Sequence, residues 1–278
     1  MKRLLFSLSF FLCAFSAQAQ SFKVATYNLR YANPADTGNL WQQRAPVVVN
    51  LIRYHDFDVF GTQEGLENQL NDILKGLPEY ARFGAGRDDG KEAGEHSAIF
   101  YKKEKFKVLK SGNFWLSETP EKPSLGWDAK CCNRICSWVY LQDLKSGRKF
   151  YFFNAHFDHE GKIARVESGK LILRKIQEIA NNEPVIFTGD LNGDHESEWY
   201  KTLASSGLLK DTYSRVAHPY ANNASFNAFG KSLSSDGIID HVFTTGKFTV
   251  QKWGLLTDTY HGKFPSDHFP VEVTLTIQ

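Results

Sequence analysis

Polar side chains able to perform acid–base and metal chemistry follow apolar stretches at six places in the chain. The six segments are 26–30 (TYNLR), 62–64 (TQE), 154–159 (NAHFDH), 188–192 (TGDLN), 239–241 (IDH) and 266–270 (SDHFP). They supply eight candidates: Asn28, Glu64, His156, Asp190, Asn192, Asp240, Asp267 and His268. Because an unpaired charge is costly in an apolar environment, six such segments in one chain favour one shared site over six separate structural roles.

The residue types indicate a hard divalent cation beside a histidine base. Asn28, Glu64 and Asp267 offer the carboxylate and carboxamide oxygens that Mg²⁺ prefers. His268, with Asp240 available from another strand end, matches an imidazole that a carboxylate holds in one tautomer. His156 can donate to an oxyanion that develops on phosphorus. This set predicts metal-assisted attack of water on a phosphate ester.

The apolar stretches that position these side chains have the composition of strands. Strands are predicted at 22–29, 59–62, 97–101, 137–141, 150–155, 185–188, 238–244 and 271–277. Apolar residues at helical spacing predict helices over 40–53 and 162–180. Strands alternate with helices in the early part of the chain and mostly follow one another in the late part. This order indicates an α/β protein with a two-layered β core flanked by helices.

The N-terminus is typical of a secretory signal peptide. Lys2 and Arg3 precede an apolar run of about 12 residues, and Ala17-Gln18-Ala19 gives a small-residue cleavage site. The run is too short to cross a bilayer. We therefore expect residues 1–19 to be removed, residues 20–278 to form a single domain with no transmembrane segment, and the protein to be periplasmic or extracellular.

The charge balance of the chain argues against nucleic acid as its partner. The chain has 33 Lys and Arg against 31 Asp and Glu, and removal of Lys2 and Arg3 leaves 31 of each. A neutral chain lacks the basic excess typical of nucleic-acid-binding proteins.

Cys131, Cys132 and Cys136 remain after cleavage, and an odd number permits one disulfide with one free thiol. Three cysteines without a nearby histidine are a poor zinc set.

In their order and context, the six segments closely resemble those of the endonuclease/exonuclease/phosphatase superfamily of metal-dependent phosphoesterases. The resemblance covers essentially the whole mature chain and implies a four-layered α/β sandwich of two packed mixed sheets. It implies that Asn28, Glu64 and Asp267 hold one or two Mg²⁺ or Mn²⁺ ions, and it leaves open whether Asp190, Asn192 and His268 also ligate metal. It also implies that Asp190 orients or deprotonates water or assists the leaving group, that Asn192 and His156 contact phosphate, and that Asp240 orients the catalytic His268.

The same resemblance places the chain near a secreted bacterial subgroup of unsettled substrate. Loops 82–90 and 114–134 carry Arg87, Trp127 and Arg134, which could hold a phosphate and stack on a sugar, base or headgroup. We expect a monomeric phosphodiesterase or phosphatase acting on small or lipid-derived phosphate esters.

Three alternatives stay open at this point. The first is a secreted nuclease acting on DNA or RNA. The second is a zinc hydrolase with the metallo-β-lactamase fold, whose His-x-His-x-Asp-His motif segment 154–159 resembles, except that Asn154 replaces the first histidine. The third is a binding module without catalytic activity, although such relatives tend to lose the carboxylates and histidines kept here.

Overall fold

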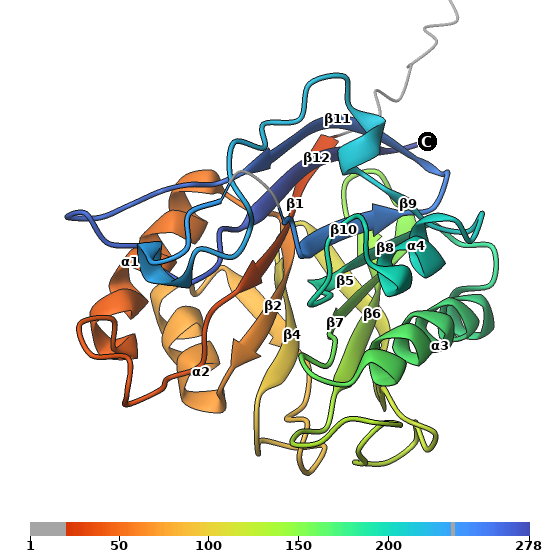
Figure 1. Ribbon diagram of the computed structural model, residues 1–278. Coiled ribbons are helices and arrows are strands. Elements are labelled where there is room, and N and C mark those ends of the chain that lie inside the picture. The colour runs from red at the N-terminus through yellow and green to blue at the C-terminus, as the bar shows by residue number, and fades with distance from the viewer. Residues whose placement is uncertain (1–20, 235–236) are drawn as a thin grey trace, which may run out of the picture.

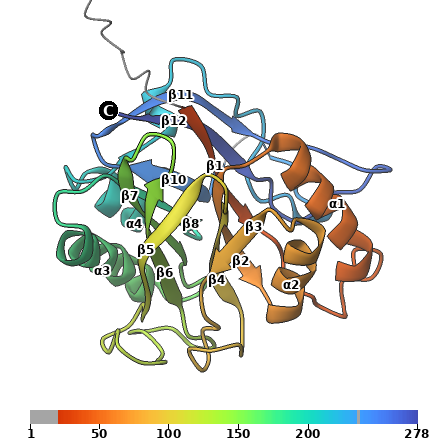
Figure 2. The ribbon, with the colours of Figure 1, turned by 180° about the vertical axis from the view of Figure 1, so that it is seen from behind.

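Two β-sheets pack face to face, and helices cover the outer face of each (Figure 1). This arrangement is seen in a computed structural model that describes residues 21–234 and 237–278. Seen from behind, α1 and α2 lie together against one sheet, while α3 and α4 lie against the other (Figure 2). The predicted four-layered α/β sandwich is confirmed.

The first sheet has the strand order β11-β12-β1-β2-β4-β3. Its strands are β1 (Ser21–Asn28), β2 (Val59–Gly65), β3 (Tyr80–Phe83), β4 (His96–Lys102), β11 (Phe248–Leu255) and β12 (Val271–Ile277). The helices α1 (Trp41–His55) and α2 (Glu67–Gly76) cover it. Only β1 and β2 run parallel, and α1 provides the crossover that a parallel pair needs.

The second sheet has the order β5-β6-β7-β8-β10-β9. Its strands are β5 (Phe106–Trp115), β6 (Ile135–Asp143), β7 (Lys149–His156), β8 (Val185–Asp190), β9 (Lys210–Asp211) and β10 (Asp240–Thr244). The helices α3 (Lys162–Ala180) and α4 (Glu198–Ala204) cover it. Here β7 and β8 are the parallel pair, with α3 as their crossover. Two single 3-10 turns, η1 (Tyr213–Arg215) and η2 (Ala228–Gly230), lie in the connections.

The main core fills the space between the two sheets. Val24 and Val59 of the first sheet belong to the same buried cluster as Phe150, Phe152 and Ile186 of the second. Separate apolar clusters join each sheet to its helices. Central strands are therefore buried on both faces, which explains why β7 and β8 read as continuous apolar runs.

A polar bridge joins the sheets near the ends of the strands. Asn154 of β7 donates its amide to the carbonyl oxygens of Thr62 and Ala98 at 2.8 and 2.9 Å, and accepts a hydrogen bond from Gln63 at 2.7 Å. A Cβ atom at Gly61 would overlap the side chain of Asn154. Asn154 thus fixes the position of one sheet relative to the other, and only glycine allows the two sheets to approach each other so closely at position 61.

All eight predicted strands and both predicted helices are confirmed, although the strand predicted at 238–244 begins at Asp240. Elements missed by the sequence patterns are β3, β5, β9, β11, α2 and α4. The predicted signal peptide lies outside the described residues. Over residues 21–234 and 237–278, none of the helices has the length and apolar character needed to traverse a bilayer.

Candidate active site

Strand ends from both sheets converge at one edge of the sandwich. In the second sheet, His156 at the end of β7 pairs in register with Asp190 at the end of β8, and Asp190 pairs with Asp240 at the start of β10. In the first sheet, β1 ends at Asn28, which donates to the Asp190 carboxylate at 2.9 Å. The predicted convergence of these segments is therefore observed.

The Asn28 amide lies between two carboxylates. Its Nδ2 donates to Glu64 Oε1 at 3.0 Å and to Asp190 Oδ2 at 2.9 Å, while its Oδ1 accepts from the backbone N–H of Arg30. In this arrangement Asn28 positions carboxylates through its nitrogen. Its predicted role as a metal ligand stays a prediction and requires the opposite orientation of the amide.

Glu64 reaches the site through an irregularity in its strand. The pairing of β2 with β4 shifts register between Thr62 and Gly65, and Glu64 has a φ of 63°. A left-handed backbone is rarely adopted by glutamate and is a form of strain that clusters at functional sites. The bulge allows the carboxylate to accept from Asn28 and from the backbone N–H of Tyr31.

The carboxylates of Glu64, Asp190 and Asp267 line the same cavity, and carboxylate oxygens are ligands that a hard divalent cation prefers. Burial and the neighbouring Asp240 raise the pKa of Asp190 to about 7. Burial, together with Glu64, also raises the pKa of Asp267. The site thus concentrates negative charge that a bound cation would stabilise.

His268 and Asp240 form a buried pair. The His268 Nδ1 atom lies 2.8 Å from Asp240 Oδ2, and Nε2 lies 3.8 Å from Asp190 Oδ2. Burial opposes a charge on the ring, but Asp240 and Asp190 outweigh it and raise the pKa of His268 well above its usual value. Asp240 therefore fixes the ring and favours the imidazolium form, which differs from the histidine base that the sequence predicted.

Asn192 and His156 contact each other, and both lie close to Asp190. The backbone N–H of Asn192 donates to Asp190 Oδ1 at 2.8 Å, and its side-chain amide lies 3.1 Å from His156 Nε2 and donates to Phe157 O at 3.0 Å. Burial, with the nearby Arg134 and Arg87 charges, lowers the pKa of His156 well below its usual value. These surroundings therefore favour the neutral imidazole form of His156.

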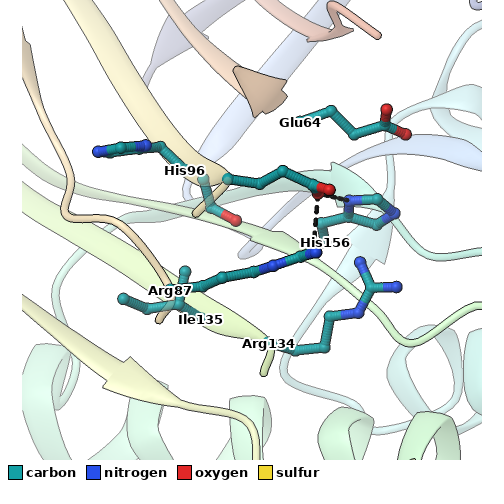
Figure 3. A pocket seen from close by; sticks show the side chains of 8 residues that line it. Glu64, Arg87, His96, Arg134, Ile135 and His156 are labelled. Carbon is teal, nitrogen blue, oxygen red and sulfur yellow. Dashed lines mark hydrogen bonds and ion pairs between the residues drawn. The ribbon is translucent and has the colours of Figure 1, made fainter. Parts of the chain in front are cut away.

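Two arginines face His156 in the adjoining pocket (Figure 3). Arg87 is paired with Glu95 at 2.7 Å, and Glu95 Oε2 lies 3.9 Å from His156 Nδ1. Arg134 is paired with Asp158 at 3.3 Å. Among the described residues, Arg87 Nε and Arg134 Nη1 are buried without a hydrogen-bond partner. The pocket thus offers two guanidinium groups that are suited to an anion.

The whole cavity has a volume of about 850 Å³. Its lining includes every predicted catalytic residue except Asp240, which contacts the lining residue His268. Lining residues that were not candidates in the sequence analysis include Arg30, Tyr31, Glu95, Phe226, Phe229 and Lys231. Glu95 precedes β4 outside any of the six segments, so residue type and spacing gave no signal for it.

The loop tryptophans lie elsewhere. Trp127, predicted to contact substrate, packs against the apolar cluster beneath α3 and is absent from the cavity lining defined by the described residues. Trp115 is buried and donates its indole N–H to the carbonyl oxygen of Arg87 at 2.7 Å. Both side chains therefore stabilise the loops. The hydrogen bond from Trp115 fixes the backbone of Arg87, whose guanidinium group reaches the pocket.

The cysteine prediction is confirmed. Cys131 and Cys132 form a disulfide on the cavity wall, and Cys136 is a buried free thiol. This pairing removes two of the three thiolates that a zinc site would require.

A four-layered α/β sandwich that gathers carboxylates and histidines at its strand ends, with two arginines from neighbouring loops, fits a phosphoesterase. The model of the Endonuclease/Exonuclease/phosphatase family matches residues 25–268. The chain therefore belongs to this family, and the enzyme is a hydrolase that acts on phosphate ester bonds. The family uses divalent metal ions, and the side chains of Asp190, Asp240 and His268 lie close enough together to hold one.

Solved structures agree with this assignment. A family protein from Bacteroides thetaiotaomicron is 47% identical, with a TM-score of 0.91, covering 94% of this chain and 99% of that one. The mannosyl-6-phosphatase of B. thetaiotaomicron VPI-5482 is also 47% identical, with a TM-score of 0.89 and coverage of 92% and 100%. D. rerio TDP2 complexed with single-strand DNA product is 18% identical with a TM-score of 0.72, covering 92% and 99%, a likeness of fold alone.

These findings exclude the metallo-β-lactamase alternative. Asn154, at the position of that motif's first histidine, is fully buried and bridges the two sheets. His156 belongs to the phosphoesterase site instead.

Proposed function

We propose that this enzyme is an exported, Mg²⁺- or Mn²⁺-dependent phosphatase that releases phosphate from small monoesters, with sugar phosphates as the substrate class. The observation that carries the proposal is the pair of guanidinium groups beside His156, that of the buried Arg134 and that of the half-buried Arg87. The 47% identity to a mannosyl-6-phosphatase supports the same substrate class.

Charge favours a monoester over a diester. A terminal phosphate carries close to two negative charges at neutral pH, whereas a diester carries one. The pocket offers two arginines and a set of carboxylates fit for a cation, so a dianion can be held at several points at once. A sugar attached to that phosphate would occupy the open part of the cavity, beside Tyr31, Phe226 and Phe229.

Each residue of the site has a distinct role in the proposed catalysis. A bound divalent cation would be held by Glu64 and Asp267 and would neutralise charge on the phosphoryl oxygens. Asp190, with its pKa near 7, accepts the proton of the attacking water. The His268 imidazolium, oriented by Asp240, stabilises the charge that develops on phosphorus oxygens. Asn192 and the arginines hold the phosphate in line for attack.

Export and a monomeric state are parts of the same proposal. The N-terminal pattern of residues 1–19 supports export. The neutral charge of the remaining chain supports a small substrate over a nucleic acid, because a polyanion would require a broader basic surface.

The deciding experiment is a substrate panel on one purified preparation with Mg²⁺ or Mn²⁺. It compares mannose 6-phosphate, glucose 6-phosphate, inositol phosphates, phospholipids, bis-p-nitrophenyl phosphate, plasmid DNA and RNA. We expect the highest kcat/KM on a sugar 6-phosphate. Preferential cleavage of plasmid or RNA would overturn the proposal in favour of a nuclease, and turnover of none would favour a binding module.

A further inference from the structure

A second group of metal-type side chains lies outside the catalytic cavity. His195 follows the Asn192 loop, Asp211 ends β9, and His241 lies on β10 next to Asp240. Their ligand atoms all lie within 4.8 Å of one another. None of the three belongs to the cavity lining or to the catalytic roles above.

Two histidine ring nitrogens lie near one carboxylate oxygen of Asp211. His241 Nε2 lies 3.0 Å from the carbonyl oxygen of Gly193 and donates to it, which turns Nδ1 toward Asp211 Oδ2 at 3.1 Å. His195 Nε2 lies 3.6 Å from the same oxygen. Within the described part of the chain, that buried His195 nitrogen has no hydrogen-bond partner.

The 3.6 Å separation of His195 Nε2 from Asp211 Oδ2 is that of two ligands of a tetrahedral zinc ion, and the 3.1 Å separation of His241 Nδ1 is about 0.2 Å shorter, the length of a hydrogen bond. Zinc binds imidazole nitrogen and carboxylate oxygen at about 2.0–2.2 Å, so two ligands of one ion lie about 3.3–3.6 Å apart. Metal-bound histidines usually donate their other ring N–H to a carbonyl or carboxylate, as His241 does to Gly193. Asp211 is also supported, by hydrogen bonds from the Tyr200 hydroxyl and the backbone N–H of Tyr213.

We propose that His195, Asp211 and His241 bind one zinc-type divalent ion, separate from the catalytic cation. Two imidazoles and one carboxylate form a softer donor set than the all-oxygen set of Glu64 and Asp267. The two sites therefore select different metals. Three protein ligands leave a fourth position for water.

The location gives this ion a positioning role. His241 holds the carbonyl oxygen of Gly193, directly after Asn192, and it follows Asp240 in sequence. A metal that joins His195 to β9 and β10 would fix the loop that carries Asn192 relative to the Asp240–His268 pair.

The test is a Zn²⁺ titration of chelator-treated full-length enzyme, monitored by calorimetry with Mg²⁺ at saturation. His195→Ala is the main variant because the His195 side chain is 30% exposed, so the substitution should leave the fold intact. His218→Ala, which changes an exposed histidine, is the matched control. Glu64→Ala separates the new site from the catalytic one.

We expect one Zn²⁺ per chain in the wild type, in His218→Ala and in Glu64→Ala. In His195→Ala the affinity should fall at least about 100-fold, because a direct ligand is lost. Equal zinc affinity in His195→Ala and wild type would overturn the proposal. Failure of the wild type to bind zinc with Mg²⁺ present would also overturn it and would leave a simple ion pair between His241 and Asp211.

Discussion

Asn28 and Asp190 join the two sheets at the site, through a hydrogen bond of 2.9 Å between the ends of β1 and β8. The same Asn28 amide nitrogen donates to Glu64, so the candidate metal carboxylate and the candidate base are held by one side chain. The distance between the two sheets therefore sets the distance between the carboxylates of Glu64 and Asp190. The Asn154 bridge, farther along the same interface, keeps that spacing fixed.

Asp190→Asn should abolish most of the activity while leaving binding nearly intact. The change keeps the shape of the side chain but removes the base, and such losses reduce kcat by about 10²–10⁴-fold. Steady-state kinetics on a sugar 6-phosphate measures the effect. Glu196→Gln, an exposed carboxylate on the same loop, is the control and should match the wild type. An unchanged kcat in Asp190→Asn would exclude the base assignment.

Asp240→Asn should lower kcat through its effect on His268. The amide no longer stabilises a positive ring, so the His268 pKa falls and its orientation loosens. We expect a loss of about 10²-fold or more in kcat, together with a lower pKa for His268 in an NMR titration. A loss of activity without any change in the histidine titration would contradict the orienting role.

Arg134→Lys should weaken recognition of the phosphate monoester. Lysine keeps the charge but loses the planar fork that can bind two phosphate oxygens. We expect kcat/KM on a sugar 6-phosphate to fall at least about tenfold, mainly through KM. Arg148→Lys serves as the control, because Arg148 bonds the carbonyl oxygen of Ile277, a residue outside the cavity lining. Equal values for the two variants would remove Arg134 from the substrate site.

Asp158 should make stability depend on pH. Burial opposes its charge, but the backbone N–H groups of Gly161 and Glu160 and the Arg134 guanidinium lower its pKa. A depressed carboxyl pKa gives stability that is present above the unfolded value of about 4 and is lost as pH falls through the folded value. Asp158→Asn should therefore cost about 1–3 kcal/mol at neutral pH, and urea unfolding should show this difference shrinking in acid. A constant difference across that range would contradict the assignment.

The sequence predicted the interior of each sheet but missed its borders. The four strands that were not predicted, β3, β5, β9 and β11, are the edge strands of the two sheets. An edge strand is exposed along one side, so polar residues interrupt its pattern, as in β5, where Lys107, Ser111 and Gly112 separate the apolar positions. Central strands lack this mixture because both of their faces are buried.

The candidate site was predictable where residues follow a strand, because strand ends from one edge must meet. It was not predictable where a loop decides the position. Glu95 reaches Arg87 from a segment without a recognisable pattern, while Trp127, in a loop that also contributes to the cavity, turns to the core. The orientation of the Asn28 amide likewise depends on carboxylates that are distant in sequence.

The most direct test of the account is phosphate release from mannose 6-phosphate by wild type and Glu64→Gln, before and after chelation. The substitution keeps the size of the side chain and removes the charge that would hold the cation. Release by the wild type should require Mg²⁺ or Mn²⁺, stop with EDTA and return when the metal is restored, while Glu64→Gln should be nearly inactive under all conditions. Phosphate release that persists in EDTA, or that is unchanged in Glu64→Gln, would contradict the central claim.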